Sequence, residues 1–77
     1  MFTSLDAALV GHLIKNISIS SSLDCMMECV GDIRCISYNF ASVSISGVCE
    51  TNNANRLSES SSLETRVGYT YFGLKVG

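Results

Sequence analysis

Charged residues are scarce in this chain of 77 residues, since only 16% are Asp, Glu, Lys or Arg. The five basic residues are scattered, so there is no basic stripe of the kind that binds nucleic acid. Long apolar runs are missing too, and no segment approaches the roughly 20 apolar residues that a membrane-spanning helix needs. The sequence therefore argues against a nucleic-acid partner and against membrane insertion.

Residues that build catalytic or metal sites are also few. His12 is the only histidine, and one histidine makes neither a metal site nor a catalytic triad unaided. The chain has no G-x-S-x-G nucleophile motif and no C-x-x-C redox pair. We therefore expect no enzymatic activity, no cofactor and no metal, and a structural or surface role for His12.

Four cysteines are the most informative residues present, with the spacing C-x3-C-x5-C-x13-C from Cys25 to Cys49. An even number in so short a chain is typical of a disulfide framework. A chain of this size buries a limited core and often needs covalent cross-links. Zinc sites favour closer ligand pairs, and a cytosolic protein would keep four free thiols. Structural disulfides are therefore the favoured interpretation.

The composition is that of one folded domain. The chain is 47% hydrophobic, which is too apolar for a disordered segment, and its length allows a single domain over residues 1–77 with a core at about 8–73. The segment Met1–Ile14 does not resemble a signal peptide, because it lacks a basic start and is interrupted by Asp6. A disulfide protein needs an export route, so we expect a module excised from a larger secreted protein.

The clearest local pattern predicts a helix ahead of Gly31, a typical C-terminal stop. Ser20–Ser22 offers N-cap residues, and Asp24 complements the helix dipole. Glu28 and Asp32 are expected to face water. The apolar residues that recur at helical spacing, and that we expect to face the core, are Leu23, Met26, Met27 and Val30.

The rest of the chain reads as strands and turns, which gives an α+β fold with one short helix packed on a small antiparallel sheet. Turns are expected at Ser44–Gly47 and Asn52–Asn55, and Leu57–Glu64 is expected to be an exposed loop. The segments with extended patterns are Ala8–Ile19, Cys35–Phe40, Gly47–Thr51 and Val67–Leu74, of which the second and third are candidates for a hairpin.

Four cysteines allow three pairings. A bridge between Cys25 and Cys29 would lie within one helical turn, where the geometry is poor. The nested pairing of Cys25 with Cys49 and of Cys29 with Cys35 suits the chain better. Cys29 lies near the helix end, where the chain turns back toward Cys35, and Cys25 lies one turn earlier and reaches the second hairpin strand.

Taken together, these residues resemble the PAN/Apple superfamily. The matching segments are LVGHLI at 9–14, SLDCMMEC at 22–29, CISYNF at 35–40 and CETNN at 49–53. The GH at 11–12 and the C-E-x-N-N pattern at 49–53 resemble the invertebrate extracellular type. The Apple domains of blood proteases carry a further disulfide between their termini, and no cysteine lies near either end here, so the chain is closer to the four-cysteine type. The resemblance implies about five antiparallel strands around one helix, with the cysteines in two structural disulfides.

The resemblance also implies a non-catalytic extracellular module for recognition or adhesion, which binds a protein or a glycan. The alternative is a structural spacer or matrix unit without a specific ligand. Arg34, Asn53 and Arg56 are the predicted contacts, because turn residues beside a rigid sheet are where recognition usually occurs. Asn16 begins an N-I-S sequon and is a candidate for glycosylation. The residues expected to pack in the core rather than form a binding platform are Tyr38, Tyr69 and Tyr71.

Overall fold

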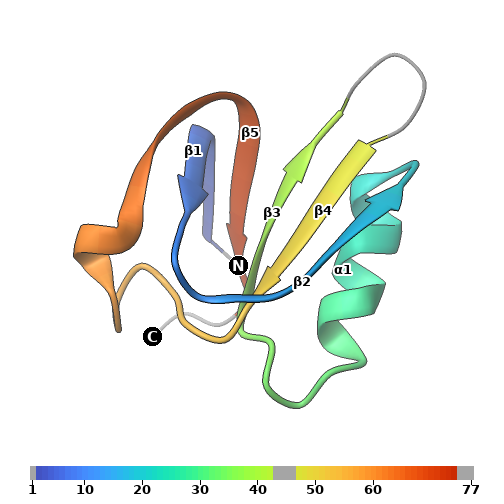
Figure 1. Cartoon of the computed structure of the whole chain (residues 1–77), viewed down its shortest axis with the longest axis horizontal. Coiled ribbons are helices and arrows are strands. Elements are labelled where there is room, and N and C mark those ends of the chain that lie inside the picture. The colour runs from blue at the N-terminus through green and yellow to red at the C-terminus, as the bar shows by residue number, and fades with distance from the viewer. Residues whose placement is uncertain (1, 43–46, 75–77) are drawn as a thin grey trace.

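The computed structural model describes residues 2–42 and 47–74 of the chain. Within these residues the chain forms five strands, one α-helix and one short 3-10 helix (Figure 1). The strands are β1 (Phe2–Leu9), β2 (Leu13–Ile19), β3 (Ser37–Ala41), β4 (Gly47–Asn52) and β5 (Leu63–Gly73). The helices are α1 (Ser22–Val30) and η1 (Ser60–Ser62).

The strands form one sheet in the order β1-β5-β3-β4-β2, and all neighbours are antiparallel. The helix α1 packs against β3, β4 and β2. This arrangement confirms the predicted α+β fold. The predicted hairpin also forms, since Phe40 of β3 pairs with Cys49 of β4. The turn expected at Ser44–Gly47 lies mostly outside the described residues.

Two segments form strands that were not predicted from the sequence pattern. β1 starts at Phe2, ahead of the expected core, and β5 starts at Leu63, inside the segment expected to be a loop. Leu63 pairs with Leu9, so these residues gain strand structure from each other. Strand preference depends strongly on such pairing, which a Ser-rich local sequence does not reveal.

The ends of α1 follow the predicted caps. The hydroxyl of Ser21 accepts a hydrogen bond from the N–H of Asp24 at 3.2 Å, which satisfies one of the free donors of the first turn. At the other end, the N–H of Gly31 donates to the carbonyl oxygen of Met27 at 3.0 Å. The helix therefore begins and ends where the sequence places it.

The predicted buried face of α1 is wrong. Met26 is half-buried, but Leu23, Met27 and Val30 are each 62% exposed. The residues that face the sheet are Cys25 and Cys29, which are fully buried. Because these two side chains lie on one side of the helix and are bonded to sulfurs of other segments, the disulfides set the rotation of α1, and most of its apolar stripe faces outward. Of the two acidic residues expected to face water, Glu28 is 41% exposed but Asp32 only 17%.

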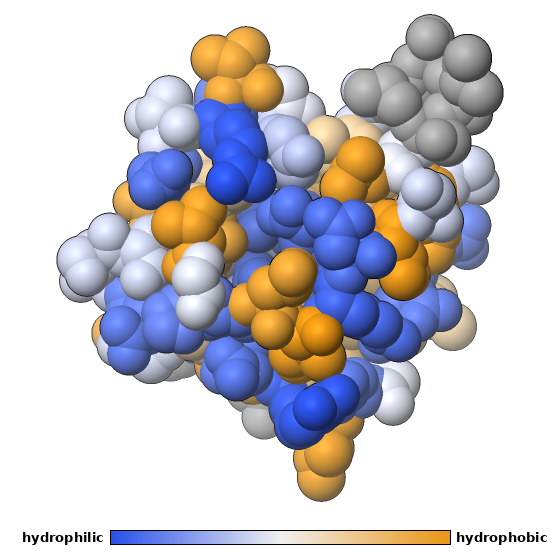
Figure 2. Space-filling view, viewed as in Figure 1, coloured by the Kyte–Doolittle hydropathy of each residue, from blue (hydrophilic) through white to orange (hydrophobic). Residues whose placement is uncertain are grey.

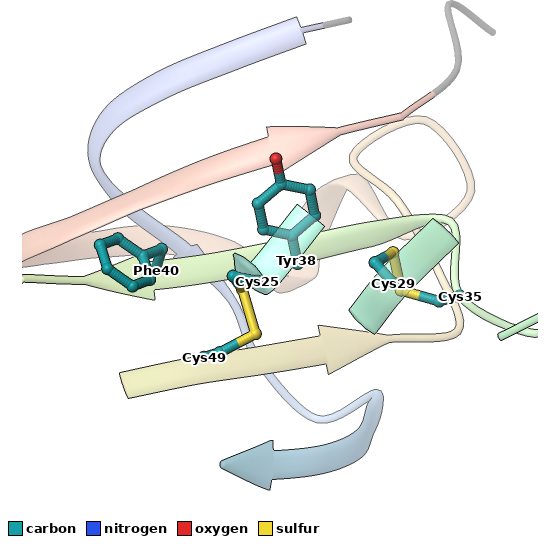
Figure 3. Packing of buried hydrophobic residues seen from close by; sticks show 6 residues of the cluster. All are labelled: Cys25, Cys29, Cys35, Tyr38, Phe40 and Cys49. Atoms are coloured by element: carbon teal, nitrogen blue, oxygen red, sulfur yellow. A yellow bond between two sulfur atoms is a disulfide. The ribbon is translucent and has the colours of Figure 1, made fainter. Parts of the chain in front are cut away.

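Two disulfides tie α1 to its surroundings. They join Cys25 to Cys49 of β4 and Cys29 to Cys35, with Cα atoms 5.5 and 5.2 Å apart. Figure 3 shows both between the helix and the sheet, next to Tyr38 and Phe40 of β3. This is the pairing that the sequence favours. It places sulfur at the centre of a first core, whose buried residues are Cys25, Cys29, Cys35, Tyr38, Phe40 and Cys49.

A second core lies on the opposite face of the sheet. Figure 1 shows that β1 rises from the N-terminus and then reverses, while β5 bends beside it. The reversal occurs at a bulge where Asp6 has a φ of +53° and Gly68 a φ of +90°, and the carboxylate of Asp6 accepts from the N–H of Gly68 at 3.1 Å. The buried residues of this core are Ala7, Leu9, Ala54 and Tyr71.

The orientation of α1 predicts a sharp contrast between two adjacent methionines. Met26→Asp should lower the free energy of unfolding by about 2 kcal/mol or more, because it places a carboxylate against the first core. Met27→Asp is the matched control and should cost less than about 1 kcal/mol, because its site is open to water. Guanidinium denaturation of the oxidised proteins measures both. Equal costs would contradict this rotation of the helix.

The two disulfides should differ in their contribution to stability. They are separated by 24 and 6 residues in the sequence, and loop closure predicts contributions of about 3.5 and about 2.4 kcal/mol. Replacing both Cys25 and Cys49 by Ala should therefore destabilise the protein more than replacing both Cys29 and Cys35. Urea denaturation gives the order, after non-reducing peptide mapping establishes the bridges. The reverse order would refute the loop-closure explanation.

Candidate binding surface

The face of the sheet away from α1 is polar at its centre. Because side chains alternate along a strand, Ser37 and Asn39 of β3 lie opposite Tyr38 and Phe40. Ser37 and Asn39 are both fully buried. Figure 2 shows a mixed surface in this view, with hydrophilic residues around several apolar patches. This face therefore differs in chemistry from the sulfur-rich face under the helix.

The amide of Asn39 fixes the end of β1 to this face. Its Oδ1 accepts from the backbone N–H of Leu9, and its Nδ2 donates to the backbone oxygen of Leu9, both at 2.9 Å. The same Nδ2 donates to Glu50 at 3.1 Å. The side chain thus pairs with Leu9 as a neighbouring peptide group would, which satisfies backbone groups that burial would otherwise leave unpaired.

A second polar contact fixes the segment after β4. The hydroxyl of Ser37 donates to the carbonyl oxygen of Ala54 at 2.6 Å and accepts from the amide of Asn52 at 3.2 Å. These two hydrogen bonds therefore hold the segment Asn52–Asn55, where a turn is expected, against this face of the sheet. Together, Ser37 and Asn39 hold two chain segments over the same face.

A shallow hollow of about 130 Å³ opens beside these segments. Its apolar lining residues are Val10, Leu13 and Leu9, of which Leu9 is only 1% exposed, and Gly11 also lines it. The polar groups that line it are Glu50, Asn52 and Arg66. Residues far apart in the sequence therefore line one open site.

The charged groups of the hollow are paired and rigidly held. The carboxylate of Glu50 is 15% exposed and contacts the guanidinium of Arg66 at 3.4 Å. It also accepts from Asn39 at 3.1 Å and from Asn16 at 3.3 Å. The guanidinium of Arg66 lies 4.8 Å from the ring centroid of Tyr69. The hollow therefore presents a negative and a positive group side by side, with no net charge.

Among the predicted contacts, Arg34 lies between α1 and β3. Its guanidinium makes two hydrogen bonds to Asp32, at 3.1 and 2.9 Å. These bonds hold the pKa of Asp32 at about 2, below its ordinary value of 3.8. Arg34 nevertheless remains 67% exposed, so its outer edge is open to a ligand.

Asn53 and Arg56 have different surroundings. Asn53 is exposed, and its backbone N–H donates to the oxygen of His12 at 3.0 Å. The guanidinium of Arg56 lies 3.7 Å from the ring centroid of Phe2, and its backbone N–H donates to the hydroxyl of Tyr71 at 2.9 Å. Arg34 pairs with Asp32, so each of the three predicted contact residues has a different partner. The structure does not bring them together in one cluster.

The other singled-out residues lie as follows. Tyr38 and Tyr71 are buried in the two cores, as expected, and Tyr69 is half-buried beside Arg66. His12 contacts Ser62 at 3.2 Å, which fits the structural role expected for it. The candidate glycosylation site Asn16 is exposed on β2.

In residues 2–42 and 47–74, no cluster of three or more potential ligand side chains is placed to hold a metal. Among the same residues, none of the helices is long and apolar enough to span a membrane.

Sequence reasoning missed Asn39, Glu50 and Arg66. The alternation in CISYNF was a usable signal for Asn39, because it places a polar side chain opposite two aromatic ones in a short strand. The same alternation in GVCET places Glu50 opposite Cys49. No local pattern identifies Arg66, which reaches Glu50 only through the bend of β5.

Comparison with known proteins identifies one family. A family model described as a PAN domain matches residues 2–76, which includes β1 and the whole of β5. No curated protein and no solved structure matches the chain.

The role of Asn39 gives a test of this surface. Asn39→Ala should lower the free energy of unfolding by about 3 kcal/mol, because it leaves the buried N–H and C=O of Leu9 unpaired. The exposed Asn53→Ala serves as the control and should change it by less than about 0.5 kcal/mol. Chemical denaturation measures both values, and hydrogen exchange at Leu9 should speed up in the first variant only. Unchanged exchange at Leu9 would show that Asn39 does not hold β1.

Proposed function

This chain belongs to the PAN domain family, and we propose that it is a non-catalytic recognition module that binds an extracellular protein or glycan. PAN domains are known as protein- or carbohydrate-binding modules and are generally non-catalytic. The observation that carries the proposal is the rigid polar face of the sheet, where buried side chains hold two chain segments beside an open hollow.

The disulfides support an extracellular location. All four cysteines are paired, and disulfides persist in oxidising compartments such as the extracellular space. PAN domains with disulfides are typically extracellular. We propose that the chain acts as one module of a larger secreted protein, with an adhesive or matrix role. Asn16, which is exposed on β2, is the proposed glycan acceptor.

A binding role accounts for the polar face better than a spacer role does. Burying polar groups is costly unless they are fully hydrogen-bonded, and a spacer needs only a stable core. Here Glu50 is held at 15% exposure by Asn39, Asn16 and Arg66, yet it still lines the hollow. Preorganised polar groups in a partly apolar hollow are typical of ligand sites.

The predicted contacts Arg34, Asn53 and Arg56 remain part of the proposal as an outer contact region. Arg34 and Asn53 are exposed, and Arg56 is half-buried against Phe2. A guanidinium has five donor N–H groups, so Arg34 keeps donors free of Asp32. These residues would contact the parts of a large ligand that extend away from the hollow.

The proposal is tested with the oxidised chain on a glycan array and in pull-downs from extracellular extract, with the reduced, unfolded chain as control. For any ligand found, the combined variant Arg34→Ala, Asn53→Ala and Arg56→Ala should bind at least tenfold more weakly, or by about 1.4 kcal/mol. Melting curves confirm that the variant is folded, because Arg56 also packs on Phe2. Unchanged affinity would rule out these contacts, and the absence of any ligand would favour the spacer.

A further inference from the structure

We infer that the hollow between the end of β1 and β4 binds a single uncharged sugar ring. This inference rests on the proposed function and specifies the ligand of one site. It is carried by the size of the hollow, the mixture of apolar and polar residues that line it, and the charge balance of Glu50 and Arg66.

The size of the hollow suits one ring of a larger ligand. Its volume is about 130 Å³, whereas pockets for whole drug-sized molecules measure roughly 300–1,000 Å³. The site is also open at its edge, where Gly11 leaves free space beside its backbone. A glycan chain could therefore place one residue in the hollow while its remainder extends over the surface.

The lining offers both kinds of contact that a sugar ring makes. Val10 and Leu13, of which Leu13 is 54% exposed, provide apolar surface in the hollow, which suits the C–H face of the ring. Glu50 and Arg66 line the same hollow, and their charged groups lie 3.4 Å apart. A hydroxyl group both donates and accepts, so adjacent hydroxyls can donate to the carboxylate and accept from the guanidinium. An aliphatic peptide side chain offers only the apolar half of these contacts.

The charge balance favours an uncharged ligand. Glu50 and Arg66 neutralise each other, so a sulfate, phosphate or carboxylate entering the hollow would meet the carboxylate of Glu50 as well as the guanidinium. Like charges at close range are unfavourable in a partly buried site. Hydroxyl groups avoid this repulsion and still form charge-assisted hydrogen bonds with both residues.

The polar groups are already in position for binding. A carboxylate has about four acceptor sites, and Glu50 uses them for Asn39, Asn16 and Arg66, which leaves capacity for a further donor. Arg66 is held over the ring of Tyr69. Because these side chains are fixed before a ligand arrives, little ordering opposes binding.

The test is a titration followed by two-dimensional amide NMR, using the oxidised, bacterially expressed chain so that Asn16 carries no glycan. The probes are glucose, galactose, mannose, fucose, N-acetylglucosamine and N-acetylgalactosamine, with heparin as the charged comparison. At least one neutral sugar should shift the amide signals of Gly11, Glu50, Asn52 and Arg66. Signals of Arg34 and Met27 should remain unchanged with the single sugars, since these residues do not line the hollow.

Two variants test the assigned roles. Arg66→Lys keeps the charge but loses the planar fork, and Glu50→Gln keeps the shape but loses the charge. Each should weaken binding of the sugar at least tenfold, with melting temperature and signal dispersion close to those of the parent chain. Glu64→Gln, at an exposed carboxylate that does not line the hollow, is the matched control and should bind normally. If Glu50→Gln does not fold, Arg66→Lys decides the question.

The possible failures can be told apart. If a glycan or protein ligand binds but no neutral sugar shifts the signals of the hollow, the inference is wrong while the proposed function stands. Binding of heparin alone, or undiminished sugar binding by Arg66→Lys, overturns the inference in the same way. If no sugar, glycan or extracellular protein binds the folded chain, the inference and the proposed function both fail.

Discussion

The central strand β3 has apolar packing on one side and buried hydrogen bonds on the other. The rest of the structure depends on how its buried side chains find packing and hydrogen-bond partners. On one side, Tyr38 and Phe40 pack against the disulfides that hold α1. On the other, the amide of Asn39 binds both backbone groups of Leu9. Because alternation along a strand is strict, a shift of one residue would place the amide against sulfur and the rings against polar groups. The register of β3 is therefore strongly determined.

The disulfides also explain why the helix can leave its apolar stripe in water. In a small domain without cross-links, an amphipathic helix is held mainly by burying its apolar face. Here Cys25 and Cys29 are bonded to other segments, and these bonds hold α1 in place although Met27 is 62% exposed. The covalent constraint replaces much of the core that a chain of this size has difficulty building.

The parts that the sequence predicted well are those with local causes. Cysteine spacing, the cap at Ser21 and the stop at Gly31 all act within a few residues, and the helix and the hairpin follow from them. The rotation of α1 did not follow, because apolar periodicity pointed to one face and sulfur bonding selected another. The bend of β1 and β5 requires a positive φ at Asp6, which a non-glycine residue rarely adopts. No pattern in the sequence predicts this bend.

The same bend explains why the candidate site could not be read from the chain. It folds the end of β1 over β3, which brings Leu9 to Asn39, and it carries Arg66 to Glu50. The apolar and polar residues that line the hollow thus come from segments that meet only in the folded chain. Predicting contacts from turn residues selects Arg34 and Asn53, which are accessible but lie outside the hollow. Because the disulfides constrain this fold, the polar side chains that are already in position for the proposed ligand lie on the sheet face. The exposed turns can only add further contacts to that ligand.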